Sequence, residues 1–327
     1  MTVAAKIGDL LPKKIHSFIQ PKYHLYKAKK QLKERGGRYS FNSQFGGWVL
    51  EIPMPRNGNM IVLVRTLREF RRAVKFGMNK KDLVWKWLNW IEPNKVLYDI
   101  GSANGLEGFS ASHLSNANVC FIEPYTPSVE TILKTISINK AGWYFDGNGG
   151  DNIREVVTNK KEKEQSNFYE VVHAACTSVE DYKRLSMHAI PVAGQTRNTY
   201  GSRHSYEEGG GRNRKNALLS QWIKGVTIDS LHYNYKMKLP DYIKIDVDGH
   251  ETLVIEGAKK VIKNRRVKSW AIELNGEKRI EDITNIMTKN GYIIAGDFDH
   301  YPNYKPPTID RIFLKKECLK SWNAFKF

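Results

Sequence analysis

The sequence predicts an α/β fold in which a doubly wound, mostly parallel sheet carries helices on both faces. Three observations lead to this prediction. From residue 96 onward, short apolar runs alternate with segments of helical periodicity, which is typical of parallel strands joined by helices. The first run, 96–101, passes through a glycine-containing turn into a helix expected at 107–114. The second run, 119–123, ends in an acidic residue, Glu123.

The first third of the chain is strongly basic and is expected to form an extension to this sheet. Residues 1–95 hold 20 Lys and Arg against 6 Asp and Glu, a net +14 out of +18 for all 327 residues. Residues 39–65 contain short apolar runs between Gly and Pro turns, which predicts strands. Apolar residues at helical spacing predict helices at 67–76 and 82–91. We therefore assign residues 1–89 to a basic α+β extension.

The segment 1–38 is Lys-rich and carries an apolar stripe, so part of it is expected to be helical. Two roles are open for it. A helix docked on the body of the protein is favoured, because runs of charge are usually solvated faces. The alternative is a basic amphipathic helix that binds an anionic membrane surface or a phosphorylated acceptor.

The domain expected over 90–327 carries an irregular insert at about 140–225. A long polar loop, 194–216, lies inside the insert, and a loop of that length is either functional or disordered. The expected strands after the first two are 168–175, 242–247, 270–274, 291–295 and 309–314, and the expected helices are 128–139, 249–261 and 280–289. Residues 226–231 are expected to form a short strand or turn.

Composition excludes several classes of protein. No run approaches the eighteen or so apolar residues of a membrane span, and charged residues and a proline interrupt the first twenty residues, unlike a signal peptide. The three cysteines are too few and too far apart for a disulfide framework or a zinc site. We expect a cytoplasmic protein, with a peripheral membrane location as the alternative that the basic extension allows.

Four segments of the chain, taken in order, match a known pattern. They are Asp99-Ile-Gly-Ser-Ala-Asn-Gly105, Phe121-Ile-Glu-Pro124 with Asn139 closing the following helix, Ile228-Asp-Ser-Leu231, and Ile243-Lys-Ile-Asp246-Val-Asp-Gly249-His-Glu251 continuing to Glu256-Gly-Ala258. This set resembles the FkbM family of methyltransferases that use S-adenosylmethionine (SAM). The resemblance covers roughly residues 90–315, and the fourth segment is its most specific part. Asn104 lies one place later than the family's asparagine, so it is assigned no contact.

The resemblance implies the class I SAM methyltransferase fold, whose sheet has seven strands, and SAM as the cofactor. A turn with glycines brings backbone N–H groups close to a ligand, and a carboxylate that ends the next strand can hold both ribose hydroxyls. The implied cofactor-binding residues are Asp99, Gly101, Ser102, Ala103, Gly105, Glu123, Pro124 and Ala175.

Methyl transfer to an aliphatic hydroxyl needs an aligned acceptor and a base or metal that takes its proton. Asp246, which ends the fourth core strand, is the expected base or acceptor ligand, and His250 is the alternative catalytic residue. Glu273 ends the fifth strand and could join Asp246 on a divalent cation, so a metal remains open. Asp248 and Glu251 are assigned to the N-cap and capping box of the next helix.

Three functions fit these residues. Members of the family methylate hydroxyls of sugars and similar acceptors, so the first is an O-methyltransferase for a saccharide, glycan or small-molecule acceptor. Tyr200, Arg203 and His204 of the long loop are candidates to line its acceptor pocket. The second is an RNA methyltransferase that uses the basic extension, although neither the Lys-Asp-Lys-Glu set of ribose methylases nor an Asn-Pro-Pro-aromatic motif is evident. The third, a non-catalytic SAM-binding module, is disfavoured by the intact carboxylates of the motifs.

Overall fold

The computed structural model describes residues 21–77, 82–140, 168–187, 198–201, 219–299 and 307–325 with their side chains, and some of the remaining chain as backbone alone. Its central sheet has seven strands in the order β17-β18-β16-β15-β4-β5-β8. Their bounds in chain order are β4 Val96–Ile100, β5 Asn118–Ile122, β8 Tyr169–Val172, β15 Tyr242–Ile245, β16 Ser269–Asn275, β17 Tyr292–Asp299 and β18 Thr308–Lys315.

Five neighbouring strands of this sheet, from β16 to β8, are parallel, whereas β18 is antiparallel to both β16 and β17. The predicted doubly wound, mostly parallel sheet is confirmed. From β4 the chain builds outward first through β5 and β8, and later through β15 and β16 on the other side. The carboxyl ends of β4 and β15 therefore form the switch point, where such sheets bind their ligands.

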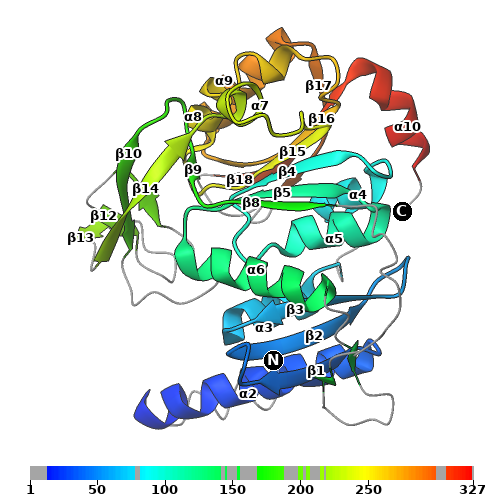
Figure 1. Cartoon of the computed structure of the whole chain (residues 1–327), viewed down its shortest axis with the longest axis vertical. Helices are drawn as coiled ribbons and strands as arrows, with labels where there is room; N and C mark the ends of the chain where they lie inside the picture. The colour runs from blue at the N-terminus through cyan, green and yellow to red at the C-terminus, as the bar shows by residue number, and fades with distance from the viewer. Residues whose placement is uncertain are drawn as a thin grey trace.

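Helices cover both faces of the central sheet (Figure 1). One face is covered by α4 (Leu83–Trp90), α5 (Leu106–Ser115) and α6 (Thr126–Lys140), and the other by α7 (Ile228–Tyr233), α8 (Glu251–Glu256) and α9 (Glu277–Lys289). Neighbouring residues of β4 point into different cores, Leu97 into the first and Tyr98 into the second. This part of the chain also contains the short helices η1 (Val261–Lys263), η2 (Lys316–Cys318) and α10 (Leu319–Ala324). Within the described ranges, every helix is too short or too polar to cross a lipid bilayer.

The N-terminal extension forms a further layer beyond α5 and α6, at the bottom of Figure 1. It contains α2 (Lys13–Glu34), the antiparallel strands β1 (Arg38–Asn42), β2 (Gly47–Pro53) and β3 (Asn59–Val64), and α3 (Leu67–Lys75). Ala28 and Leu32 of α2 are buried, and this helix packs on α3 and β1 of the extension itself. Phe70 of α3 lies in the same hydrophobic core as Phe109 of α5. The expected boundary at residue 89 therefore marks a change in charge composition, and one hydrophobic core continues across it.

The insert is more regular than the sequence indicated. A four-stranded sheet in the order β11-β10-β14-β9 is formed by β9 (Ala175–Cys176), β10 (Tyr182–Met187), β11 (Thr199–Tyr200) and β14 (Leu219–Val226). Two short pairs join β6 (Tyr144–Phe145) to β7 (Ile153–Arg154) and β12 (His204–Tyr206) to β13 (Arg214–Asn216). The expectation of a strand or turn at 226–231 is wrong beyond residue 226, because Thr227 and Ser230 form a capping box that starts α7.

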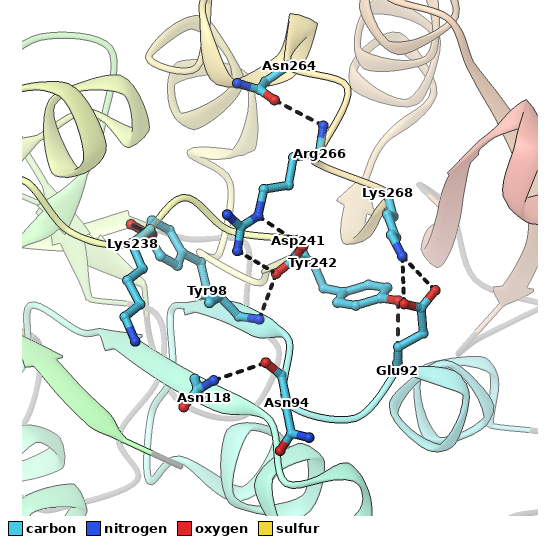
Figure 2. A network of polar contacts seen from close by, with 11 residues as sticks. Glu92, Asn94, Tyr98, Asn118, Lys238, Asp241, Tyr242, Asn264, Arg266 and Lys268 are labelled. Atoms are coloured by element: carbon cyan, nitrogen blue, oxygen red, sulfur yellow. Dashed lines mark hydrogen bonds and ion pairs between the residues drawn. The ribbon is translucent and has the colours of Figure 1, made fainter. Parts of the chain in front are cut away.

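A polar network fastens the amino ends of the central strands, at the edge opposite the switch point (Figure 2). The buried Asp241 side chain accepts a hydrogen bond from Val96 N (2.9 Å) and pairs with Arg266 (3.2 Å). Nearby, Lys268 Nζ lies 2.6 Å from Glu92 Oε2. None of the candidate site residues lies in this network, so we assign it to the fastening of β4 to β15 and β16.

Candidate active site

The turn between β4 and α5 uses left-handed backbone at three positions. The φ angles are 74° at Gly101, 49° at Ala103 and 77° at Gly105. A Cβ at Gly101 would lie 1.9 Å from the carbonyl oxygen of Asp246, so both the backbone angle and the close approach require glycine there. Asp246 N also donates to Ile100 O (3.0 Å). The glycine turn and the end of β15 are therefore in direct contact, as expected at the switch point.

Glu123, just after β5, holds the glycine turn from the side. Its Oε2 accepts a hydrogen bond from Ala103 N and its Oε1 accepts one from Tyr125 N, each at 2.8 Å. Burial raises the pKa of Glu123 to about 7. Each carboxylate oxygen can accept a further hydrogen bond. Ser102 is fastened as well, since its Oγ donates to Asp99 O.

Asp99 and Lys244 form a buried ion pair beneath the turn, and Lys244 is a site residue that the sequence reasoning missed. Lys244 Nζ lies 3.3 Å from Asp99 Oδ1 and 3.6 Å from Asp246 Oδ2. Gly108 N donates to Asp99 Oδ2 (3.1 Å). The Asp99 side chain has no exposed surface, so it supports the turn from inside the protein. The available signal was a lysine within an apolar strand, which indicates a buried charge that needs partners.

Asp246 follows β15 directly, and Glu273 lies near the carboxyl end of the neighbouring strand β16. The negative charge of Asp246, together with burial, raises the pKa of Glu273 to about 8. The Asp246 side chain is 27% exposed, so a ligand can reach it. At neutral pH the site thus offers a protonated carboxyl group beside an accessible Asp246. In the part of the chain that the structure describes, no group of three or more His, Cys, Asp and Glu side chains gathers to hold a metal ion.

His250 connects the site to the insert. Its Nε2 lies 3.2 Å from the carbonyl oxygen of Tyr200, and because a carbonyl only accepts, Nε2 is the donor. Burial lowers the pKa of His250. The Tyr200 side chain is buried and donates its hydroxyl to Asp181 (2.6 Å). Arg203 lies outside the described residues, and His204 is described as backbone alone.

The predicted capping box before α8 is wrong. The N-cap is His250, not Asp248, and it makes no side-chain cap. Asp248 has φ 50°, so the chain makes a left-handed turn there and the helix begins two residues later than expected. Glu251 instead accepts a hydrogen bond from Gly249 N (2.7 Å) and pairs with Arg279 (3.4 Å).

The insert borders the site beside Glu123. Ala175 in β9 pairs with Gly225 of β14, and Gln221 Nε2 donates to Pro124 O (2.9 Å). Pro124 and Ala175, both predicted cofactor residues, therefore lie along one edge of the site, where each is hydrogen-bonded or paired to β14 of the insert.

Arg72 is a second residue that the sequence reasoning missed. It projects from α3 in the extension, and its Nη2 lies 2.7 Å from Glu107 Oε1 at the start of α5. The carboxyl groups of Glu107, Asp246 and Glu273 all raise the pKa of Arg72. In the sequence it is one of several arginines on a predicted helix, a pattern that indicates a solvated face.

The raised pKa of Glu273 predicts a pH-dependent stability. The folded protein holds this proton up to about pH 8, whereas the unfolded chain releases it near the ordinary value of 4.5. The contribution of Glu273 to the stability of the folded protein is therefore fully present below pH 4.5 and is lost as the pH rises toward 8. We expect Glu273→Gln to flatten the fall in melting temperature between pH 5 and 8, by roughly 2–4 °C at the upper end. Glu281→Gln, at an exposed carboxyl on α9, is the control. Equal slopes in wild type and Glu273→Gln would contradict the raised pKa.

The strand order, the glycine turn and the acidic residue after β5 together define a class I SAM-dependent methyltransferase. A family model described as the methyltransferase FkbM domain matches residues 99–294. The chain therefore belongs to the FkbM methyltransferases, and SAM is its cofactor. The site fits this cofactor, because Asn104 Oδ1 and Glu107 Oε2, in and just after the glycine turn, are buried and have no hydrogen-bond partner among the described residues.

Solved structures of other methyltransferases are similar at low sequence identity. Precorrin-6y C5,15-methyltransferase from Geobacter metallireducens has 12% identity and a TM-score of 0.35, with 73% of this chain and 92% of that one covered. TrmK from M. capricolum, solved with S-adenosylhomocysteine, has 10% identity and a TM-score of 0.36, with 70% and 66% covered. TYW2 from M. jannaschii, solved with AdoMet, has 12% identity and a TM-score of 0.34, with 81% and 86% covered. A search of curated proteins gave no significant match.

Proposed function

We propose that this enzyme transfers the methyl group of SAM to a hydroxyl of a saccharide or similar small acceptor. The observation that carries the proposal is the accessible carboxyl of Asp246, a residue that follows β15 and whose backbone carbonyl lies against Gly101 of the glycine turn. An aliphatic hydroxyl is a weak nucleophile at neutral pH, so a base must take its proton as the new bond forms. Asp246 is the proposed base. His250 suits a positioning role, because its Nε2 already donates to the Tyr200 carbonyl.

Bound SAM supplies a methyl group on a positively charged sulfur. The proposed step breaks the acceptor O–H bond, whose proton moves to Asp246, while the oxygen bonds to the methyl carbon and the S–CH3 bond breaks. Glu273, protonated beside Asp246, is proposed to donate a hydrogen bond to the acceptor oxygen. Glu123 is proposed to hold the ribose hydroxyls. The remaining predicted cofactor contacts come from Gly101, Ser102, Ala103, Gly105, Pro124 and Ala175.

A divalent cation on Asp246 and Glu273 is the alternative way to remove the proton. Two carboxylates are a weak cation site by themselves, and one of them holds a proton near neutral pH. Methyl transfer measured with and without a chelator separates the two mechanisms. Undiminished activity with the chelator supports Asp246 as the base.

The acceptor class is tested by mass spectrometry of glycans and RNA from cells with and without the gene. We expect glycans to gain one methyl group on a sugar hydroxyl when the gene is present, and this transfer to be reproduced with purified enzyme. A gene-dependent change in RNA methylation without one in glycans would overturn the proposal. It would point to the RNA methyltransferase that the basic extension allows.

A further inference from the structure

An ion pair joins the N-terminal extension to the first turn of α5, close to the glycine turn. Arg72 Nη2 lies 2.7 Å from Glu107 Oε1, and the side chains are 38% and 8% exposed. A guanidinium has five N–H donors in a fixed fork, more than one carboxylate can use. Glu107 Oε2, the other oxygen of the carboxylate, is buried without a hydrogen-bond partner among the described residues. The pair therefore offers donors and an acceptor beyond those that hold it together.

Arg72 and Lys244 are the two cations whose charges act on the Glu107 carboxyl group, and they differ in access. Lys244 is 6% exposed and is placed between Asp99 and Asp246. Arg72 is partly exposed, and the Asp246 and Glu273 carboxyl groups act on it from the ends of β15 and β16. Of these two cations, Arg72 is the one that a ligand can contact.

We propose that the Arg72–Glu107 pair binds the amino-acid end of SAM. That end carries an α-carboxylate and an α-ammonium on one carbon, so it needs a cation and an anion side by side. Arg72 donates to the carboxylate through N–H groups that Glu107 does not use, and Glu107 Oε2 accepts from the ammonium. The N-terminal extension thereby completes the cofactor site, through a residue outside the segment 99–294 that matches the family.

The surrounding charges favour this ligand over an anionic acceptor. Arg72 is within the influence of three carboxyl groups, on Glu107, Asp246 and Glu273. A phosphate would be repelled by the negative charges of Glu107 and Asp246, and it carries no positive group to compensate. The amino-acid end of SAM brings its own ammonium, which would compensate for these negative charges.

Calorimetry with two probes tests the proposal. S-adenosylhomocysteine keeps the amino-acid end, and 5′-methylthioadenosine lacks it. We expect Arg72→Met and Glu107→Gln each to weaken S-adenosylhomocysteine binding by roughly ten- to a hundredfold, through loss of charge-assisted hydrogen bonds. Binding of 5′-methylthioadenosine should change by less than about threefold. Arg68→Met, at an exposed arginine of the same helix, should alter neither affinity.

Unchanged S-adenosylhomocysteine affinity in folded Arg72→Met would overturn the proposal. So would equal losses for both probes, because they would show a general effect on the shape of the site. If Arg72→Met does not fold, Arg72→Lys serves instead, since it keeps the charge but not the fork, and a smaller loss for S-adenosylhomocysteine alone is expected. None of these measurements uses an acceptor, so an error in the proposed acceptor class would not affect them.

Discussion

Asp246→Asn is expected to lower kcat for methyl transfer by roughly a hundredfold or more, while SAM affinity stays within a few-fold. The amide keeps the size of the side chain but cannot take a proton from the acceptor hydroxyl. Lys244, 3.6 Å from Asp246, also pairs with Asp99, so the glycine turn keeps its buried cation in the variant. The measurement is steady-state kinetics on the acceptor found by glycan analysis, with SAM affinity measured separately by calorimetry.

Two variants in the same turn make this test specific. Asp248→Asn changes an exposed carboxylate two residues along the chain and should leave kcat within a few-fold. His250→Ala should have a milder effect than Asp246→Asn, because His250 holds the Tyr200 carbonyl. If Asp246→Asn loses SAM affinity alone, Asp246 belongs to the cofactor site and His250 becomes the preferred base. If neither Asp246→Asn nor His250→Ala slows methyl transfer, the proton of the acceptor hydroxyl leaves by another route, such as one that uses a bound metal ion.

The central sheet could be predicted because its determinants are local. Each strand is a short apolar run, and the glycines at 101 and 105 lie where the backbone is left-handed. The start of α8 could not be predicted from its capping pattern. The Asp248–Gly249 turn is left-handed, and Glu251 is engaged by Gly249 and by Arg279 from α9. A tertiary contact thus overrode a local signal. The same happened in the insert, whose sheet pairs residues of β9 with residues of β14 fifty positions later.

The predicted site contained several carboxylates but neither Glu107 nor the cations that lie beside these groups. Asp99, Glu123 and Asp246 could be found because each follows or ends an apolar run. Lys244 could have been suspected from its place in a strand, since a buried charge needs partners. Arg72 could not, because α3 is brought to α5 by packing of the extension, which no spacing within the chain encodes.

Lys244→Met is expected to destabilise the protein by roughly 3–5 kcal/mol, because it leaves a buried carboxylate without its cation. Asp99 has no exposed surface, and after the substitution it keeps the hydrogen bond from the backbone N–H of Gly108. Methionine is similar in length and suits the apolar strand, so lost packing contributes little. Lys268→Met is the control, since its ion pair with Glu92 is partly exposed and is worth about 1 kcal/mol or less. Denaturant unfolding of both variants beside wild type gives the comparison.

A second substitution shows whether the loss comes from charge. The double variant Lys244→Met with Asp99→Asn replaces the unpaired carboxylate by a neutral amide that still accepts a hydrogen bond from Gly108 N. It should therefore regain much of the lost stability. The stability gap between Lys244→Met and wild type should also narrow as the pH falls. Burial already raises the pKa of Asp99 and Lys244 opposes the rise, so without the lysine this carboxyl takes up a proton more readily in the folded state than in the unfolded chain. Two results would contradict this: a stability difference between Lys244→Met and wild type that is constant with pH, or a double variant no more stable than Lys244→Met. Either would mean that Lys244 acts through packing, and not as the cation that permits Asp99 to be buried under the cofactor turn.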